Sequence, residues 1–257
     1  MTRVALVTGA ARGIGAATVR ALAADGWSVL AVDRASDDPR LPYALGTPEE
    51  LEALRTPTVM PWVADATDPA ALQAAVREAE RAFGGLDAAV AVAGVVAGGV
   101  PLWEQPQEQV DAVLQVDLHA VVALARAAVP ALLRRPPPRH GRFLAVSSTA
   151  AVRGLPLLAA YCAAKAGVTG LVRALAVELG GSGITANAVS PGSTDTRVLA
   201  ESARLYGLPT AQQFALQQPL GRLLEPEEVA AALVWLAGPQ AAAVTGAVLP
   251  VDGGLAL

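Results

Sequence analysis

One stretch near the start of the chain, Thr8–Gly15, reads T-G-A-A-R-G-I-G and decides the architecture of the protein. The apolar run Val4–Val7 precedes it, and an Ala-rich segment typical of a helix comes after it. A strand, a glycine turn and a helix in this order bring free backbone N–H groups and the positive end of a helix dipole to a place where a pyrophosphate can bind. We therefore predict a dinucleotide site with spacing G-x-x-x-G-x-G. Its predicted contacts are Gly9, Arg12, Gly13, Ile14 and Gly15.

Beyond this loop, short apolar runs alternate with Ala- and Leu-rich segments. Strands are predicted at 4–8, 28–33, 58–64, 88–92, 142–147, 185–190 and 247–251, and helices at 13–24, 72–83, 108–133, 159–179 and 227–237. Strands that are apolar on both faces and alternate with helices indicate a parallel sheet covered on both sides. We predict one α/β domain over residues 1–257, a Rossmann-type, doubly wound, three-layer α/β/α fold. Two segments look irregular: an insertion at about 35–57 and a substrate lid at about 197–219.

The composition argues against several other classes of protein. The 257 residues carry a net charge of −4, and no cluster of basic residues suggests a nucleic-acid partner. The uncharged run Val229–Val251 is interrupted at Gly238-Pro239, which predicts a helix, a turn and a strand instead of a membrane span. Cys162 is the only cysteine, the N-terminal sequence lacks a signal-peptide pattern, and no metal-ligand spacing is present. These features predict a cytoplasmic protein without a metal.

One basic residue stands apart from the others. Lys and Arg total 19, yet Lys165 is the only lysine. A bias toward Ala and Arg is typical of a GC-rich genome, so a lysine that survives it indicates a position where arginine cannot substitute. Chance is the alternative interpretation.

Lys165 ends the sequence Y-C-A-A-K, which begins at Tyr161. Residues i and i+4 share one face of a helix, so the phenol and the ammonium point into the same space. A nearby cation favours the phenolate, and Tyr161 could then accept a proton from an alcohol as hydride leaves for a nicotinamide cofactor. Ser148 at the end of a predicted strand could hydrogen-bond the reacting oxygen. These three residues form the predicted catalytic set.

The second predicted strand ends in Asp33, about 20 residues beyond the glycine loop. A carboxylate at this position accepts hydrogen bonds from the adenosine ribose hydroxyls and repels a 2′-phosphate. NAD is therefore the predicted cofactor. Arg34 and Arg12 are also predicted to lie at the cofactor, where either could in principle counter the repulsion.

Together these motifs resemble the short-chain dehydrogenase/reductase family of the TGxxxGIG … YxxxK type, over essentially the whole chain. The resemblance implies that Lys165 also hydrogen-bonds the nicotinamide ribose and that Asp252–Gly254 belongs to a homotetramer interface. It further implies cofactor contacts from Asp65, Ala66, Ala91, Gly94, Pro191, Gly192, Thr194 and Thr196.

Two positions depart from the family pattern. The family motif N-N-A-G reads A-V-A-G at Ala91–Gly94, so both side-chain amides are missing. The catalytic asparagine of the long middle helix is Asp117 in this chain. In the family that position kinks the helix so that a backbone carbonyl holds a water beneath the lysine. Asp117 either preserves this water or adds a carboxylate near Lys165, which leaves its catalytic role open.

A finer resemblance links residues 32–57, 98–104 and 191–194 to the mycofactocin-associated subgroup of the family. It implies a tightly held NAD that an external redox carrier reoxidises in place, whereas an ordinary surface insertion is the alternative. The apolar lid, with Leu155, Leu157 and Leu158 near Ser148, predicts a hydrophobic alcohol or ketone substrate.

We predict an NAD-dependent alcohol dehydrogenase or ketone reductase. The alternatives are a family member with freely exchanging NAD(P), such as a 3-oxoacyl reductase or a diol dehydrogenase, and a non-catalytic dinucleotide-binding protein.

Overall fold

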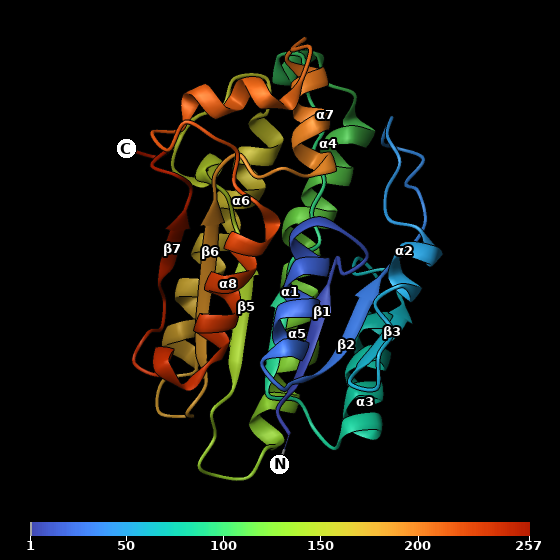
Figure 1. Ribbon diagram of the computed structural model, residues 1–257, viewed down its shortest axis with the longest axis vertical. Helices are drawn as coiled ribbons and strands as arrows, with labels where there is room; N and C mark the ends of the chain where they lie inside the picture. The colour runs from blue at the N-terminus through green and yellow to red at the C-terminus, as the bar shows by residue number, and fades with distance from the viewer. Residues whose placement is uncertain (1) are drawn as a thin grey trace.

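The computed structural model describes residues 2–257 and places their seven strands in one parallel sheet (Figure 1). The strands lie in the order β3-β2-β1-β4-β5-β6-β7. The chain therefore winds outward from β1 in one direction and from β4 in the other, and ligands bind at this switch point. The strands are β1 (Val4–Thr8), β2 (Ser28–Asp33), β3 (Val59–Val63), β4 (Ala88–Ala91), β5 (Arg142–Val146), β6 (Thr185–Pro191) and β7 (Val248–Val251).

Helices cover both faces of the sheet. In Figure 1, α1 (Gly13–Ala24) and α8 (Pro226–Ala237) lie in front of it, whereas α3 (Pro69–Phe83), α5 (Ala120–Arg134) and α6 (Ala159–Glu178) lie behind it. Neighbouring strand residues alternate between the two cores, because successive side chains point to opposite faces. Leu6 packs with the residues of α3 and α5, and Val7 packs with those of α1 and α8. The predicted three-layer, doubly wound fold is confirmed.

The predicted boundaries of the main elements agree with the structure to within about three residues. The largest difference lies in the long helix predicted at 108–133. It consists of α4 (Gln107–Leu114) and α5, joined by the π-helical turn Gln115–His119. π-Helical turns inside helices are frequent at functional sites, and this one carries Asp117.

The two segments predicted to be irregular are partly helical, which corrects that expectation for the insertion and suits the substrate lid, since such lids are often partly helical. The insertion contains α2 (Pro48–Glu52), which begins with a capping box between Thr47 and Glu50 and has Pro48 in its first turn. The lid contains α7 (Arg197–Leu205) and a short 3₁₀ helix at Ala211–Gln217. Both segments lie at the carboxyl edge of the sheet. In Figure 1, α7 of the lid stands above the strand ends, and α4 stands there too.

Within residues 2–257, two helices are long and apolar enough to cross a membrane by length and composition alone: the continuous run Gln107–Arg134 and α6. Both contact the sheet: α5 packs on β4 and β5, and α6 packs on β5 and β6. Their apolar side chains therefore contribute to the core of this domain. The uncharged run Val229–Val251 forms most of α8, a turn and β7, as predicted.

Candidate active site

The glycine loop takes a backbone path that needs glycine. Gly9 and Gly13 have φ values of +68° and +54°, in the left-handed region that other residues rarely adopt. A Cβ at Gly9 would lie 2.6 Å from the Cα of Ala93, and a Cβ at Gly15 would collide with the carbonyl oxygen of Gly9. The loop is therefore pressed against the end of β4 and leaves the N-terminus of α1 free to face a ligand.

Asp33 is held by the backbone around it. Its Oδ2 accepts a hydrogen bond from the N–H of Ala11 at 3.0 Å, and its Oδ1 accepts one from the N–H of Ala35 at 2.9 Å. These contacts fix the carboxylate beside the glycine loop, where adenosine ribose hydroxyls are bound in folds of this kind.

Arg34 is already engaged by acidic side chains. Its Nη1 lies 3.0 Å from Asp38, which is 2% exposed, and its Nη2 lies 3.9 Å from Asp65. An arginine bound in this way is not available to offset the repulsion between Asp33 and a 2′-phosphate.

The insertion crosses from the cofactor side of the site to α4. Asp38 also binds Arg40, whose guanidinium reaches Gln115 at 2.7 Å. Further along, the Tyr43 hydroxyl accepts a hydrogen bond from the N–H of Val96 at 2.9 Å, and the Arg12 guanidinium donates to the carbonyl of Ala44 at 2.6 Å. Residues 38–44 of the insertion are thus held against both the glycine loop and the segments after β4.

One large cavity, of about 1010 Å³, contains nearly all the predicted site residues. It is lined by Gly9, Arg12, Gly13, Ile14, Gly15, Asp33, Arg34, Asp65, Ala66, Gly94, Asp117, Ser148, Tyr161, Lys165, Pro191, Gly192, Thr194 and Thr196. Ala91 is the exception: it is buried within β4, and Val92, Ala93 and Gly94 line the cavity in its place. Ala91 is the last residue of β4, so the backbone reaches the cavity only from Val92 onward, and the contact of Ala91 with the cofactor stays a prediction.

The pyrophosphate end of this cavity fits a dinucleotide. A Cβ at Gly13 would lie 3.3 Å from the side chain of Thr196, so the glycine loop and the turn after β6 face each other across a narrow space. Arg12 has a buried Nη1 without a hydrogen-bond partner among residues 2–257. A free guanidinium nitrogen and free helix N–H groups suit an anionic phosphate.

Lys165 is almost fully buried, with 3% of its surface exposed. Its ammonium donates a hydrogen bond to the carbonyl of Val146 at 3.3 Å and lies 5.6 Å from the centre of the Tyr161 ring. The helix α6 places both side chains on one face, as the i, i+4 spacing predicts. The predicted proximity of phenol and ammonium is therefore confirmed.

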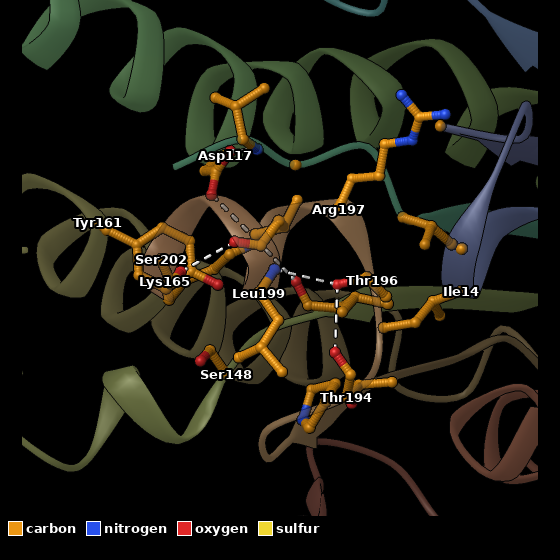
Figure 2. A pocket seen from close by; sticks show the side chains of 18 of the residues that line it. Ile14, Asp117, Ser148, Tyr161, Lys165, Thr194, Thr196, Arg197, Leu199 and Ser202 are labelled. Carbon is orange, nitrogen blue, oxygen red and sulfur yellow. Dashed lines mark hydrogen bonds and ion pairs between the residues drawn. The ribbon is translucent and has the colours of Figure 1, made fainter. Parts of the chain in front are cut away.

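Asp117 is fully buried beneath this pair. Its Oδ1 accepts a hydrogen bond from the N–H of Val95 at 2.7 Å, and its Oδ2 lies 3.4 Å from the Lys165 ammonium (Figure 2). That Oδ2 has no hydrogen-bond partner in the described part of the chain. Of the two alternatives left by the sequence, the structure shows a carboxylate added next to the lysine.

The charges in this group act on one another. Burial raises the pKa of Tyr161 above its usual value; Lys165 opposes the increase, whereas Asp117 adds to it. Lys165 lowers the pKa of Tyr161, as expected for a cation that favours the phenolate. Burial raises this pKa by more, so the pKa of Tyr161 is raised overall. Burial also raises the pKa of Asp117, against the effect of Lys165. For Lys165 burial acts to lower the pKa, yet the nearby Asp117 carboxylate and Tyr161 raise it overall.

Ser148 follows β5 and caps the short 3₁₀ helix Thr149–Ala151. Its Oγ accepts a hydrogen bond from the N–H of Ala150 at 3.1 Å, which leaves its own proton available for another acceptor. The hydroxyl opens into the same cavity as Tyr161.

The rest of the cavity wall is largely apolar. It includes Leu155, Pro156, Leu158, Leu199, Tyr206, Leu208 and Phe214, from the loop after β5 and from the lid. Trp103, in the short segment that precedes α4, is 85% exposed and does not line the cavity. Sequence reasoning missed Leu45 and Gly46 of the insertion, and Arg153, which follows Ser148 by five positions.

Comparison with known proteins agrees with this geometry. The family model described as enoyl-(acyl carrier protein) reductase matches residues 9–256. The chain is 40% identical over 256 residues to cis-4-hydroxycyclohexanecarboxylate dehydrogenase from Sinomonas cyclohexanicum, covering 98% of this chain and 96% of that protein.

Two solved structures are also similar. Carveol dehydrogenase from Mycobacterium avium, in complex with NAD, has a TM-score of 0.92 at 30% identity and covers 98% of this chain and 97% of its own. The 3-ketoacyl-(acyl-carrier-protein) reductase from Brucella melitensis, complexed with NADH, has a TM-score of 0.87 at 30% identity and covers 99% and 98%. The fold and the site are those of an oxidoreductase, and the chain belongs to the short-chain dehydrogenase/reductase family.

Proposed function

We propose that the protein is an NAD-dependent dehydrogenase or ketone reductase that transfers a hydride between a hydrophobic secondary alcohol and the nicotinamide. The observation that carries the proposal is the meeting of Ser148, Tyr161 and Lys165 in one cavity with the glycine loop. Asp33, with Arg34 engaged by Asp38, supports NAD over NADP. The NAD and NADH in the two similar structures also support this cofactor.

Bound at the glycine loop and the turn Pro191–Thr196, the nicotinamide cofactor would supply a hydride acceptor or donor. Ser148 donates a hydrogen bond to the reacting oxygen and holds it against Tyr161. In oxidation the Tyr161 oxygen takes the alcohol proton, and in reduction it returns one to the carbonyl oxygen. Lys165 stabilises the phenolate form, and Asp117 keeps the Lys165 ammonium charged and in place.

The test is turnover of a panel of secondary alcohols with NAD, monitored by the absorbance of reduced nicotinamide. We expect oxidation by the wild-type protein and loss of about 100-fold or more in Tyr161→Phe, which removes the acid/base group. Retained turnover in Tyr161→Phe would refute the mechanism. A wild-type protein that binds NAD without turning over any alcohol would favour the non-catalytic alternative, and a clear preference for NADPH would favour a 3-oxoacyl reductase.

A second proposal concerns the exchange of the cofactor. The insertion is tied to Gln115 through Arg40, to Val96 through Tyr43 and to α7 through a 3.7 Å ion pair between Glu50 and Arg197. An insertion held by these three contacts would slow the release of NAD. These contacts support a retained NAD, and we propose that a mycofactocin-type carrier reoxidises it in place. Exhaustive dialysis and then mass spectrometry of the released ligand test it, and complete loss of NAD would favour free exchange.

We further propose a cytoplasmic homotetramer. Val177 of α6 and Trp235 of α8 are 81% and 43% exposed, and large apolar side chains on helices near the edge strand β7 suit contacts between copies. Light scattering on the purified protein tests this, and a monomer at micromolar concentration would refute the tetramer.

A further inference from the structure

The charged residues of the cavity are unevenly distributed. Most belong to segments assigned to the dinucleotide or to the group beneath Tyr161. They are Arg12, Asp33, Arg34, Asp65, Asp195 and Arg197 on the cofactor side, with Asp117 and Lys165 under the tyrosine. Arg153 is different, because it lies in the loop after Ser148 together with Leu155, Pro156 and Leu158. Arg153 is itself exposed to solvent, and the residues beside it in this part of the cavity wall are apolar.

The backbone fixes the position of Arg153 relative to Ser148. The N–H of Arg153 donates to the carbonyl of Thr149 at 2.9 Å, so Arg153 lies one helical turn beyond the catalytic serine. Its Nη1 donates to the carbonyl of Leu255 at 2.8 Å, and Leu255 also lines the cavity. The guanidinium is therefore anchored at one nitrogen on the rim of the substrate end.

The other guanidinium nitrogens of Arg153 make no hydrogen bond to a residue in the described range 2–257. Within residues 2–257, no Asp or Glu lies within ion-pair distance of Arg153, and the same holds for the exposed Arg77 and Arg173. Unlike those two arginines, Arg153 lines the cavity. A guanidinium offers five N–H donors in a planar fork that matches a carboxylate with two parallel hydrogen bonds. Arg153 is thus positioned to receive an anion that no part of the described chain provides.

We propose that Arg153 is a specificity-determining residue that binds a carboxylate of the substrate. This inference rests on the proposed function, because it names the class of that substrate: a hydroxy acid or keto acid. In such a substrate an apolar body separates the carboxylate from the reacting carbon. The apolar wall holds the body, Ser148 and Tyr161 hold the oxygen, and Arg153 holds the anion at the other end. Arg153 is the cation that this end of the cavity offers to a carboxylate, so the preference for the acid over a neutral analogue should depend on it.

Steady-state kinetics with matched substrates test the proposal. We compare cis-4-hydroxycyclohexanecarboxylate with its methyl ester, which keeps the ring and the hydroxyl but lacks the charge. The ratio of kcat/KM for the acid to that for the ester is expected to fall about 10- to 100-fold in Arg153→Met, the range for a charge-assisted hydrogen bond. Arg153→Lys keeps the positive charge without the planar fork of donors. Its acid-to-ester ratio should lie between the ratios of the wild-type protein and Arg153→Met. Arg77→Met, at an exposed position of α3, is the matched control and should leave the ratio unchanged.

A binding measurement separates the failure of this inference from that of the proposed function. Cyclohexanecarboxylate has no hydroxyl to react, so calorimetric titration of the NAD-loaded protein reports recognition without turnover. We expect binding by the wild-type protein and binding weaker by about 10-fold or more by Arg153→Met. Equal binding by both proteins, no binding by the wild type, or an unchanged acid-to-ester ratio would overturn the role of Arg153. Binding that depends on Arg153 without any turnover would instead reject the proposed function alone.

Discussion

The Asp117 carboxylate lies 3.4 Å from the Lys165 ammonium, and both side chains are buried beneath Tyr161. Because burial in a medium of low dielectric strengthens charge interactions, this pair sets the electrostatics of the proposed acid/base residue. The negative charge raises the pKa of Tyr161 and also that of Lys165.

Replacing Asp117 by asparagine should shift the pH dependence of catalysis. Asparagine keeps an oxygen that can accept from Val95 but removes the charge that raises the pKa of Tyr161. Oxidation requires the phenolate, so its rate rises as pH increases through that pKa. In Asp117→Asn the rising limb should therefore move to lower pH. Profiles of kcat/KM against pH measure it, with Asp111→Asn on the exposed side of α4 as the control. A limb that stays in place or moves upward would contradict the assigned coupling.

Lys165→Arg should preserve the fold and lose most turnover. The ammonium sits between Val146, Asp117 and the Tyr161 ring, and a Cβ at Gly94 would lie 3.4 Å from it, so a broad guanidinium does not fit the same space. We expect kcat to fall by about 100-fold or more. The control is Arg173→Lys, the reverse exchange at an exposed position of α6, which should leave turnover unchanged. Near-normal turnover in Lys165→Arg, with an unchanged melting temperature, would show that the lysine is not required.

The cofactor preference should depend on the charge of Asp33. The wild-type protein should prefer NAD over NADP, and Asp33→Asn should weaken NAD binding about 10-fold or more because a charged acceptor for the ribose hydroxyls is lost. The ratio of NAD affinity to NADP affinity should decrease further in Asp33→Asn, because the carboxylate no longer repels the 2′-phosphate of NADP. Fluorescence titration with both dinucleotides measures the two affinities. Unchanged selectivity would mean that the adenosine end binds elsewhere.

The ion pair between Glu50 and Arg197 should affect how long NAD stays bound. It joins α2 of the insertion to α7 of the lid, and both partners are partly exposed, so its contribution is small. Glu50→Gln should accelerate NAD release about two- to fivefold, with a smaller difference at high salt. Stopped-flow displacement of bound NAD measures this, and Glu49→Gln on the same helix is the control. Equal release rates for all three proteins would remove the ion pair from the exchange step.

Much of this architecture could be predicted from the sequence because the strands are buried on both faces. The run Val4–Val7 is apolar throughout, and the change from strand to glycine loop is local. The catalytic spacing of Tyr161 and Lys165 depends only on the helix repeat, so it too could be inferred. The short helix α2 also has a local signal, the Thr47–Glu50 capping box with Pro48, which indicates a helix start inside the segment predicted to be irregular.

Other features depend on contacts between distant segments. The bond from Val96 to Tyr43 joins residues 53 positions apart, and no local pattern indicates it. The orientation of Asp117 toward Lys165 arises from the π-helical turn and from the N–H of Val95 on another segment. The net pKa of Tyr161 likewise depends on burial, which only the packed structure reveals.

The burial of Lys165 has a practical consequence for chemical modification. Reagents that acylate lysine, including common fluorescent labels and cross-linkers, have a single side chain to attack in this protein, and 3% of it is exposed. Such cross-linkers would therefore have to join subunits through their terminal amines, so weak cross-linking would say little about whether the subunits associate. The rate of Lys165 acylation, followed by intact-protein mass spectrometry, would instead report how often the cavity opens.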